Sequence, residues 1–405
     1  MHSRLFAKRI LDWAEQHGRH DLPWQKTPDR YRVWVSEIML QQTQVKTVIP
    51  YYERFMRSFP TVLILATSPE DFVLEHWSGL GYYARARNLH KSAEIIALEH
   101  AGELPTTLDG LMALPGIGRS TAGAILSLAD NQPTPILDGN VKRVLARYAG
   151  IDGYPGKAAV LKQLWTLTES LTPNKNTGRF NQAMMDMGAT LCTRSRPRCG
   201  ECPLASSCVA YSEGEGKPEN YPGKKPRKVL PVKSVSMMVL RNSEGHVQLE
   251  QRPPSGIWGG LWSLPEFPSV HSEKPLADAE PAKQSKQPQG AKEDLTAWLA
   301  KRGFKAGREG EGEKVAEFRH TFSHYHLEIS VVELPVTEID VAIMEPAHTV
   351  WYKGGKWPGG MAAPMSKLDQ VLHGDKPPKR AKKPNKTGQS KPNKRSTQND
   401  SGELL

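Results

Sequence analysis

The sequence predicts an α+β protein with two domains, a mostly helical domain followed by a small α/β domain. Apolar residues recur at helical spacing through residues 1–212, whereas beyond residue 231 they recur at every second position. The intervening residues, 213–231, are polar and rich in Pro and Gly, as linkers are. At 405 residues the chain is long enough for each domain to bury its own core.

The first domain contains eight segments with apolar residues at helical spacing, and Gly or Pro separates most of them. They are residues 5–14, 33–49, 62–77, 89–98, 108–129, 137–149, 158–171 and 180–191. The first segment is amphipathic and lacks the continuous apolar stretch of a signal peptide. No apolar stretch approaches the ~20 residues of a membrane span. We therefore expect a soluble, cytoplasmic protein with no membrane partner.

The second domain, residues 232–372, predicts two hairpins and one helix. The strands of the hairpins alternate apolar and polar residues, and a Gly-containing turn joins the first pair. The hairpins are expected at 234–252 and 314–334, and the helix at 293–301. Residues 271–290 are rich in Lys, Gln and Pro and predict a mobile loop.

The balance of charges favours a polyanionic partner. The formal net charge is +11, which is typical of proteins that bind nucleic acid. From Gly374 to Leu405, nine Lys and Arg residues and three acidic residues give a net +6, which leaves about +5 for the rest of the chain. Residues 373–405 predict a basic, disordered tail. The tail alone is a weak indication of DNA binding.

All four cysteines of the chain fall within one short stretch, Cys192, Cys199, Cys202 and Cys208, with the spacing C-x6-C-x2-C-x5-C. A disulfide framework does not explain such clustering in a long cytoplasmic chain, so a metal site is predicted. Four thiolates suit tetrahedral zinc, and the spacing matches neither common ferredoxin pattern. Spacing alone therefore leaves zinc and an iron–sulfur cluster open. The three arginines between the first two cysteines make this loop basic, which suits phosphate binding.

The stretch "LMALPGIGRSTAGAIL" at residues 111–126 predicts a helix, a tight hairpin and a second helix. Pro115 lacks a backbone donor, and Gly116 and Gly118 tolerate positive φ. An ordinary corner between two helices has the same pattern. Alternatively, the glycines expose backbone N–H groups at a helix N-terminus, where such groups hold phosphate. Ser120 follows directly after the turn.

Glu37 lies within the apolar helical stretch "VWVSEIMLQQTQV". A lone glutamate on a helix is ordinarily solvated, but Trp34, Ile38 and Leu40 crowd this one. Such surroundings should raise the pKa of the carboxyl group, which suits a general acid.

Asp138 follows an apolar pair and precedes Gly139 and a helix in "ILDGNVKRVLARY". A helix N-cap explains this position without any chemistry. However, Asp138 follows Gly118 by 20 residues, and the order hairpin, helix, aspartate is recognisable.

Together, "LPGIGRSTA", "LDGNVKR" and the four-cysteine loop resemble the helix-hairpin-helix, Gly/Pro-rich, Asp superfamily of DNA glycosylases. "SEIMLQQTQV" and "GLGYYARARNLH" resemble its adenine DNA glycosylase branch. "GIWGGLWSLPEF" and "FRHTFSHYHLE" resemble the Nudix-related domain of that branch. The resemblance covers roughly residues 1–365.

The resemblance implies a helical glycosylase domain at 1–212, a linker at 213–231, a Nudix-like domain at 232–372 that recognises the opposite base, and a tail at 373–405. It also implies a 4Fe–4S cluster rather than zinc. The implied substrate is double-stranded DNA with adenine opposite 8-oxoguanine or guanine, in base-excision repair. A bacterial, nucleoid-associated monomer is expected.

The resemblance also assigns roles to residues. Glu37 is the expected general acid, Asp138 stabilises the sugar cation, and Asn140 orients Asp138 or the water. The other candidates are expected to contact DNA. Gln41, Gln42 and Tyr82 are expected to fill the space in the base stack that the flipped adenine nucleotide leaves. Gly116, Gly118 and Ser120 are expected to contact DNA at the hairpin, and Ser323 and His324 at the base opposite adenine.

Two alternatives remain at this point. The first is a bifunctional glycosylase and lyase of the endonuclease III type, whose members carry a lysine where this chain has Ser120. The second is a non-catalytic protein that binds damaged DNA, against which the presence of both Glu37 and Asp138 counts. In the second domain Gly260 and Glu266 match the start of a Nudix box, but its later Arg-Glu and paired-Glu elements are missing. We expect this domain to bind and not to hydrolyse.

Overall fold

A computed structural model describes residues 2–212, 217–226, 229–267, 294–307, 312–339, 348–368 and 372. The predicted loop at 271–290 and the tail at 373–405 lie outside the described residues. Within the described residues, no helix has both the length and the apolar character needed to cross a membrane.

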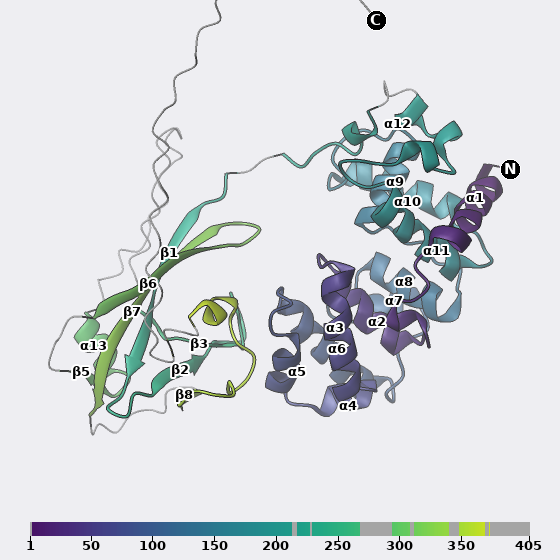
Figure 1. Ribbon diagram of the computed structural model, residues 1–405. Helices are drawn as coiled ribbons and strands as arrows, with labels where there is room; N and C mark the ends of the chain where they lie inside the picture. The colour runs from purple at the N-terminus through teal and green to yellow at the C-terminus, as the bar shows by residue number, and fades with distance from the viewer. Residues whose placement is uncertain are drawn as a thin grey trace, which may run out of the picture.

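The first domain is helical, as predicted (Figure 1). Its helices are α1 (His2–His17), α2 (Arg30–Leu40), α3 (Val45–Ser58), α4 (Val62–Thr67), α5 (Glu70–Trp77), α6 (Ala84–Glu99), α7 (Leu108–Met112), α8 (Arg119–Asp130), α9 (Gly139–Tyr148), α10 (Ala158–Leu171), α11 (Thr177–Asp186) and α12 (Val209–Ser212). A short 3-10 helix, η1, covers Pro23–Gln25, and a π-helical turn, η2, extends α11 over Met187–Leu191.

Two segments that the apolar spacing predicts as single helices are each divided in the structure. Residues 33–49 break between Leu40 and Val45, where Gln42 has φ +57°. Residues 62–77 break at Ser68, which precedes Pro69 and is extended. A residue before proline is disfavoured in the helical conformation, which explains the second break.

The helices pack into two hydrophobic clusters. The first surrounds Trp34, Phe55 and Trp77, and the second surrounds Ile10 and Phe180; all five side chains are fully buried. Helix α8 belongs to both clusters, because Ile125 lies in the first and Ala124 in the second. The hairpin helix therefore runs between the two halves of the domain.

The second domain is a mixed β-sheet with one described helix. Both predicted hairpins are present, since β1 pairs with β2 and β6 with β7 in antiparallel register. The elements are β1 (Val232–Arg241), β2 (Val247–Gln251), β3 (Trp262–Ser263), β4 (Glu266–Phe267), α13 (Leu295–Ala300), β5 (Phe304–Ala306), β6 (Glu313–Thr321), β7 (His326–Glu338) and β8 (Thr349–Tyr352). β1 also pairs with β7 in parallel, from Val232↔His326 to Arg241↔Pro335, and this pairing joins the two hairpins.

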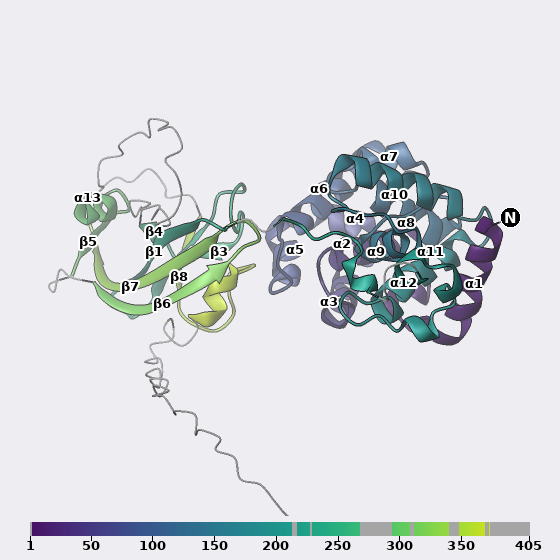
Figure 2. The same cartoon turned by 90° about the horizontal axis from the view of Figure 1, so that it is seen from above.

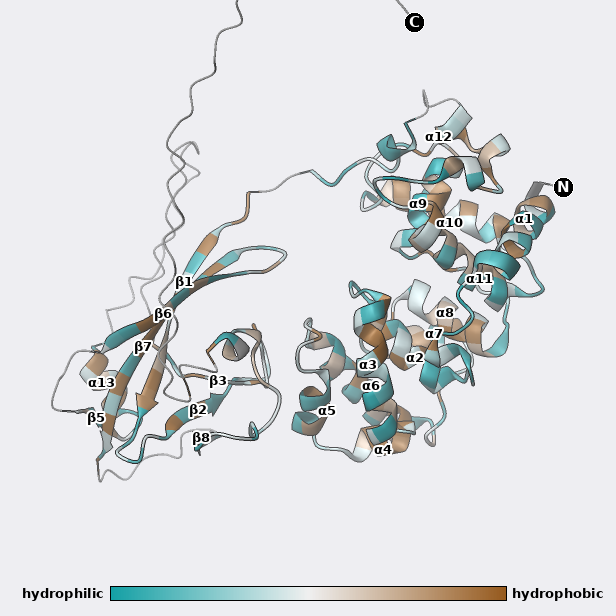
Figure 3. Ribbon diagram, viewed as in Figure 1, coloured by the Kyte–Doolittle hydropathy of each residue, from teal (hydrophilic) through white to brown (hydrophobic). Residues whose placement is uncertain are grey.

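The buried hydrophobic residues of both domains form these cores. In Figure 3 hydrophobic and hydrophilic residues are interspersed along the strands and helices of both domains. The first hydrophobic cluster continues into the second domain through Leu261 and Met361. Figure 2 shows this domain approaching the helical domain near α5 and α6.

Candidate active site and iron–sulfur centre

Glu37 lies near the end of α2, one turn beyond Val33. Its neighbours Ser36 and Ile38 are buried, and the helix packs along α8. Burial raises the pKa of the Glu37 carboxyl to about 8, and the negative charge of Asp138 contributes to the rise. The direction agrees with the sequence prediction, and the carboxyl group is protonated at neutral pH.

Asp138 is the N-cap of α9. Its Oδ1 accepts a hydrogen bond from the Val141 N–H at 2.7 Å, and its Oδ2 accepts one from the Asn140 side-chain amide at 3.2 Å. Asp138 therefore does two things at once. One of its carboxylate oxygens caps helix α9, and the negative charge of the carboxylate acts on Glu37. The structure thus brings the two predicted carboxyl groups into one site.

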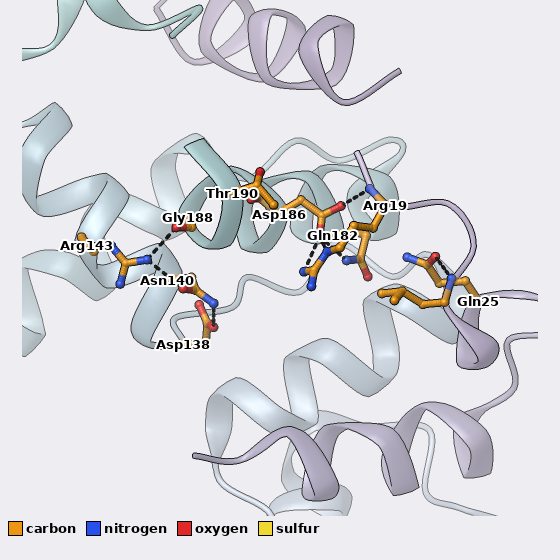
Figure 4. Close-up of polar contacts among 10 residues, drawn as sticks. Arg19, Gln25, Asp138, Asn140, Arg143, Gln182, Asp186, Gly188 and Thr190 are labelled. Carbon is orange, nitrogen blue, oxygen red and sulfur yellow. Dashed lines mark hydrogen bonds and ion pairs between the residues drawn. The ribbon is translucent and has the colours of Figure 1, made fainter. Parts of the chain in front are cut away.

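Asn140 is itself held in place. Its Oδ1 accepts a hydrogen bond from Arg143 at 2.8 Å, and Arg143 also donates to the carbonyl oxygens of Gly188 at 2.7 Å and Cys192 at 2.8 Å. Figure 4 shows this group beside the turn η2. A Cβ on Gly188 would lie 2.5 Å from the Asn140 Cβ, so the close approach requires glycine.

A cavity of about 480 Å³ lies between α1, η1, α8 and α11, and its lining includes Trp24, Val33 and Gln182. Val33 is one helical turn from Glu37, so the cavity and the carboxyl group share a face of α2. The buried Asp186 carboxylate accepts hydrogen bonds from the Arg19 guanidinium at 2.6 and 2.8 Å and from Gln182 at 2.8 Å (Figure 4). The sequence analysis missed these residues, because they come from segments far apart in the chain and carry no motif.

The hairpin between α7 and α8 has the predicted shape. Of its two glycines, Gly116 uses its tolerance of positive φ, with φ +80°, whereas Gly118 has φ −92° and is the extended N-cap of α8. A Cβ on Gly118 would meet nothing within 4 Å, and both glycines are exposed. The backbone N–H groups at the start of α8 are therefore open to a ligand. The hairpin is anchored by Ser92, which donates to the Pro115 carbonyl at 2.9 Å.

Two candidate DNA contacts, Gln42 and Tyr82, have the uncommon positive φ values of +57° and +50°. Tyr82 is half exposed, and Gln42 is exposed. The buried Arg85 side chain holds both segments, because it donates to the carbonyls of Gln41 at 2.6 Å and Gly81 at 3.1 Å. Burial lowers the pKa of Arg85 to about 10. Backbone strain of this kind clusters at functional sites, and the sequence carries no signal for the role of Arg85.

The four cysteines form no disulfides and lie half-buried around one cavity between α9, η2 and α12. Among the described residues, no group of three His, Cys, Asp or Glu side chains is set to hold a single metal ion. The donor set nevertheless fits a cluster, which needs four thiolates around a space. The buried Arg147 side chain donates to the Cys192 Sγ at 3.3 Å and to the Thr193 carbonyl at 2.7 Å, so it organises this loop.

The turn between β6 and β7 carries Ser323 and His324, both exposed. The turn is closed by a hydrogen bond from the Phe322 N–H to the Tyr325 carbonyl at 2.9 Å. The Ser323 hydroxyl lies 3.4 Å from the His324 Nδ1. Both polar side chains therefore stand at the tip of a rigid hairpin.

Comparisons with known proteins agree with this arrangement. Residues 35–170 match the family described as HhH-GPD superfamily base excision DNA repair protein, residues 192–208 the iron-sulfur binding domain of endonuclease III, and residues 236–370 the NUDIX domain. An adenine DNA glycosylase of Buchnera aphidicola subsp. Acyrthosiphon pisum is 41% identical over 348 residues, which cover 86% of this chain and 91% of the relative. This chain belongs to the adenine DNA glycosylase family.

The human adenine DNA glycosylase is 34% identical, with 92% of this chain and 74% of the human one covered. A solved thermostable thymine-DNA glycosylase aligns with 52% of this chain at 28% identity and a TM-score of 0.48. The enzyme is thus an adenine DNA glycosylase of base-excision repair with a helix-hairpin-helix domain, a Nudix-like domain and a 4Fe–4S cluster. The expected family and cofactor are confirmed.

Proposed function

We propose that the enzyme excises adenine opposite 8-oxoguanine or guanine in double-stranded DNA and leaves an abasic site without cutting the strand. The observation that carries this proposal is that Glu37 and Asp138 share one site, where burial and the charge of Asp138 raise the pKa of the Glu37 carboxyl to about 8. Two carboxyl groups in different protonation states are the usual means of breaking a glycosidic bond. These are the two groups that adenine release requires.

Glu37 acts as the general acid in this mechanism. Adenine stacked in a duplex is out of reach, so the nucleotide is first flipped out at a cost of about a few kcal/mol. Adenine leaves poorly as an anion, and a proton from Glu37 to ring nitrogen N7 makes it a neutral leaving group. Burial keeps this proton on Glu37 at neutral pH, where an ordinary glutamate is ionised.

Asp138 stabilises the sugar as adenine leaves, because the sugar becomes an oxocarbenium-like cation that a nearby carboxylate attracts. Asn140 donates to Asp138 Oδ2, which fixes the orientation of the carboxylate. A water molecule then adds to the sugar, and the product is an abasic site.

The cavity next to Val33 is the proposed pocket for the extruded adenine. Its volume of about 480 Å³ suffices for a purine, and Val33 in its lining lies one helical turn before Glu37 on α2. The Gln182 amide offers one donor and one acceptor, the arrangement with which glutamine binds an adenine edge. With N7 facing Glu37, the exocyclic amine lies next to N7 on the same edge of the base, and N1 lies beyond it.

Two kinds of group bind the DNA. Backbone N–H groups bind the phosphates, and side chains fill the space that the flipped nucleotide leaves in the base stack. The exposed N–H groups near Gly116 and Gly118 bind a phosphate without reading sequence. Gln41, Gln42 and Tyr82 fill the space that the flipped nucleotide leaves. Arg85 supports this role, because it keeps both segments in their strained conformations.

Ser120 makes the enzyme monofunctional. A lyase needs an amine that attacks the sugar, and the Ser120 hydroxyl is a weak nucleophile that instead accepts a hydrogen bond from the Leu137 N–H. The reaction therefore ends with hydrolysis.

The second domain reads the base opposite adenine through Ser323 and His324. In the partial Nudix motif, the Glu266 carboxylate is engaged by Arg252. This ion pair supports a binding role in place of nucleotide hydrolysis, because a paired carboxylate is a poorer ligand for Mg²⁺.

The remaining assignments follow from the family. Cys192, Cys199, Cys202 and Cys208 are the proposed cluster ligands. The proposed domain limits are 1–212, 213–231, 232–372 and 373–405. Part of the linker packs on the helical domain, since Tyr221 accepts a hydrogen bond from Arg147 at 3.0 Å. We propose a monomer that acts on the nucleoid in the bacterial cytoplasm.

One assay tests the proposal. The enzyme is incubated with duplexes that carry adenine opposite 8-oxoguanine, guanine, cytosine or thymine, with and without alkali afterwards. We expect strand breaks only after alkali and only opposite 8-oxoguanine and guanine. Breaks without alkali would indicate a lyase, and equal cleavage of all four duplexes would contradict mispair specificity.

A further inference from the structure

The second domain contacts the helical domain through several specific hydrogen bonds. Arg87 on α6 donates to the Gly259 carbonyl at 2.6 Å, and the Tyr83 hydroxyl donates to the Met361 carbonyl at 3.3 Å. Gln251 of β2 donates to the Asp71 carboxylate of α5. Figure 2 shows this region where the second domain approaches α5 and α6.

The backbones approach too closely here for side chains to intervene. A Cβ on Gly360 would lie 2.8 Å from the carbonyl carbon of Leu74. A Cβ on Gly260 would lie 3.2 Å from the Glu70 Oε1 and 3.3 Å from the Leu74 Cδ1. The interface is therefore a fitted surface with defined register.

On the helical side, this interface adjoins the segment that carries Tyr82. The next residue, Tyr83, is buried, and its hydroxyl accepts a hydrogen bond from the Gly79 N–H at 3.2 Å while it donates to Met361. Arg87 follows one turn later on α6. The half-exposed Tyr82 is thus directly continuous with the contacts to the second domain.

On the other side, the interface adjoins the turn that carries Ser323 and His324. Trp258 precedes Gly259 and is buried, with φ +53°. Its ring centroid lies 5.3 Å from that of Phe322, the residue before Ser323. Ring contacts at this distance fix the orientation of aromatic side chains.

We propose that Arg87 and Trp258 are positioning residues that hold the turn at Ser323 and His324 in a fixed place relative to Tyr82. The proposal rests on the proposed reading of the opposite base by the second domain. Adenine and its partner belong to one base pair, so the elements that contact them must keep a fixed separation. A domain held by its linker alone samples many positions, which lowers its effective concentration at the opposite base.

Single-turnover excision of adenine opposite 8-oxoguanine and opposite guanine tests this proposal in the full-length enzyme. Arg87→Ala should reduce the preference for 8-oxoguanine about tenfold, the effect of one charge-assisted hydrogen bond. Trp258→Ala should reduce it by a similar factor of about ten, because it removes the ring contact with Phe322. The rate opposite guanine should stay unchanged, because Glu37 and Asp138 are untouched. Arg87→Lys and Trp258→Phe should largely restore the preference. The double variant should be no worse than either single variant.

Arg54→Ala is the matched control, because Arg54 donates to the His76 carbonyl at 2.8 Å within the helical domain. It should leave the preference unchanged.

A further variant, Ser323→Ala with His324→Ala, separates the two proposals. If that variant loses the preference while Arg87→Ala and Trp258→Ala retain it, the positioning roles are wrong and the reading of the opposite base stands. If it retains the preference, the reading itself is wrong. Equal losses opposite both bases in the Arg87 and Trp258 variants would also overturn the positioning roles.

Discussion

The Ser120 hydroxyl accepts a hydrogen bond from the backbone N–H of Leu137, with an Oγ–N distance of 2.9 Å. Ser120 lies in the first turn of α8, and Leu137 immediately precedes Asp138. The helix that follows the hairpin is therefore bonded to the backbone that presents the proposed catalytic carboxylate. The hairpin proposed to bind DNA and the carboxylate proposed to act on the sugar thus lie on directly connected elements.

This relationship predicts the effect of Ser120→Lys. A lysine at this position places an amine beside the segment leading to Asp138, so the variant should form a covalent enzyme–DNA adduct that borohydride traps. It should also lose stability, because the Leu137 N–H loses its partner at a cost of about 1–3 kcal/mol.

The measurement compares Ser120→Lys with Ser120→Ala, both in a Lys142→Ala background, since Lys142 is close to Asp138 in sequence. The alanine variant loses the same hydrogen bond without gaining an amine. Adduct and strand cleavage at the level of the alanine variant would show that residue 120 does not face the sugar.

The raised pKa of Glu37 predicts the pH dependence of adenine release. A general acid must carry its proton, so the single-turnover rate should hold up to a pH near 8 and fall as Glu37 ionises above it. The decline should approach tenfold per pH unit, as for any single ionisation. If the rate already declines from about pH 4.5, near the pKa of an ordinary glutamate, then a Glu37 carboxyl with a raised pKa does not supply the proton.

The contact between Gly188 and Asn140 predicts the effect of Gly188→Ala. The added methyl group would lie 2.5 Å from the Asn140 Cβ, so Asn140 must move and the orientation of Asp138 must change with it. Adenine release should slow by about tenfold or more, the cost of about 1.4 kcal/mol in the transition state.

Arg54→Ala is the control, because its hydrogen bond to the His76 carbonyl involves neither Asn140 nor the cysteine loop. Both variants should retain the cluster absorption of the parent. Equal rates for the two variants would show that Asn140 does not act through its position.

The four cysteines predict the metal content. The purified enzyme should be brown, with broad visible absorption and about four iron atoms per chain, as family clusters have. Metal analysis of anaerobically purified protein checks this. Stoichiometric zinc without iron would refute the assignment of the cysteines.

Local patterns were sufficient to predict most of the elements and the direction of the pKa shift of Glu37, whereas Asp138 was singled out through the family resemblance. The helix at Ala158–Leu171 has the predicted limits, and both hairpins of the second domain are present, because periodicity and turn residues act over short distances. Glu37 and Asp138 each lie in a short motif, "SEIMLQQTQV" and "LDGNVKR".

Contacts between distant segments were not predictable from local patterns. The parallel pairing of β1 with β7 joins residues more than 90 positions apart, from Val232↔His326 onward. The role of Arg85 depends on carbonyl groups that only the fold brings together. The cavity at Gln182 likewise combines residues from five elements that are far apart in the sequence.

The central claim is that Glu37 supplies the proton for adenine release, and Glu37→Gln tests it most directly. The amide keeps the shape of the side chain but has no acidic proton. Affinity for a duplex with adenine opposite 8-oxoguanine, measured alongside single-turnover excision, should be retained. The excision rate should fall by at least about 10²-fold, the lower end of what general acid catalysis contributes. Retained affinity with a near-normal rate would contradict the claim.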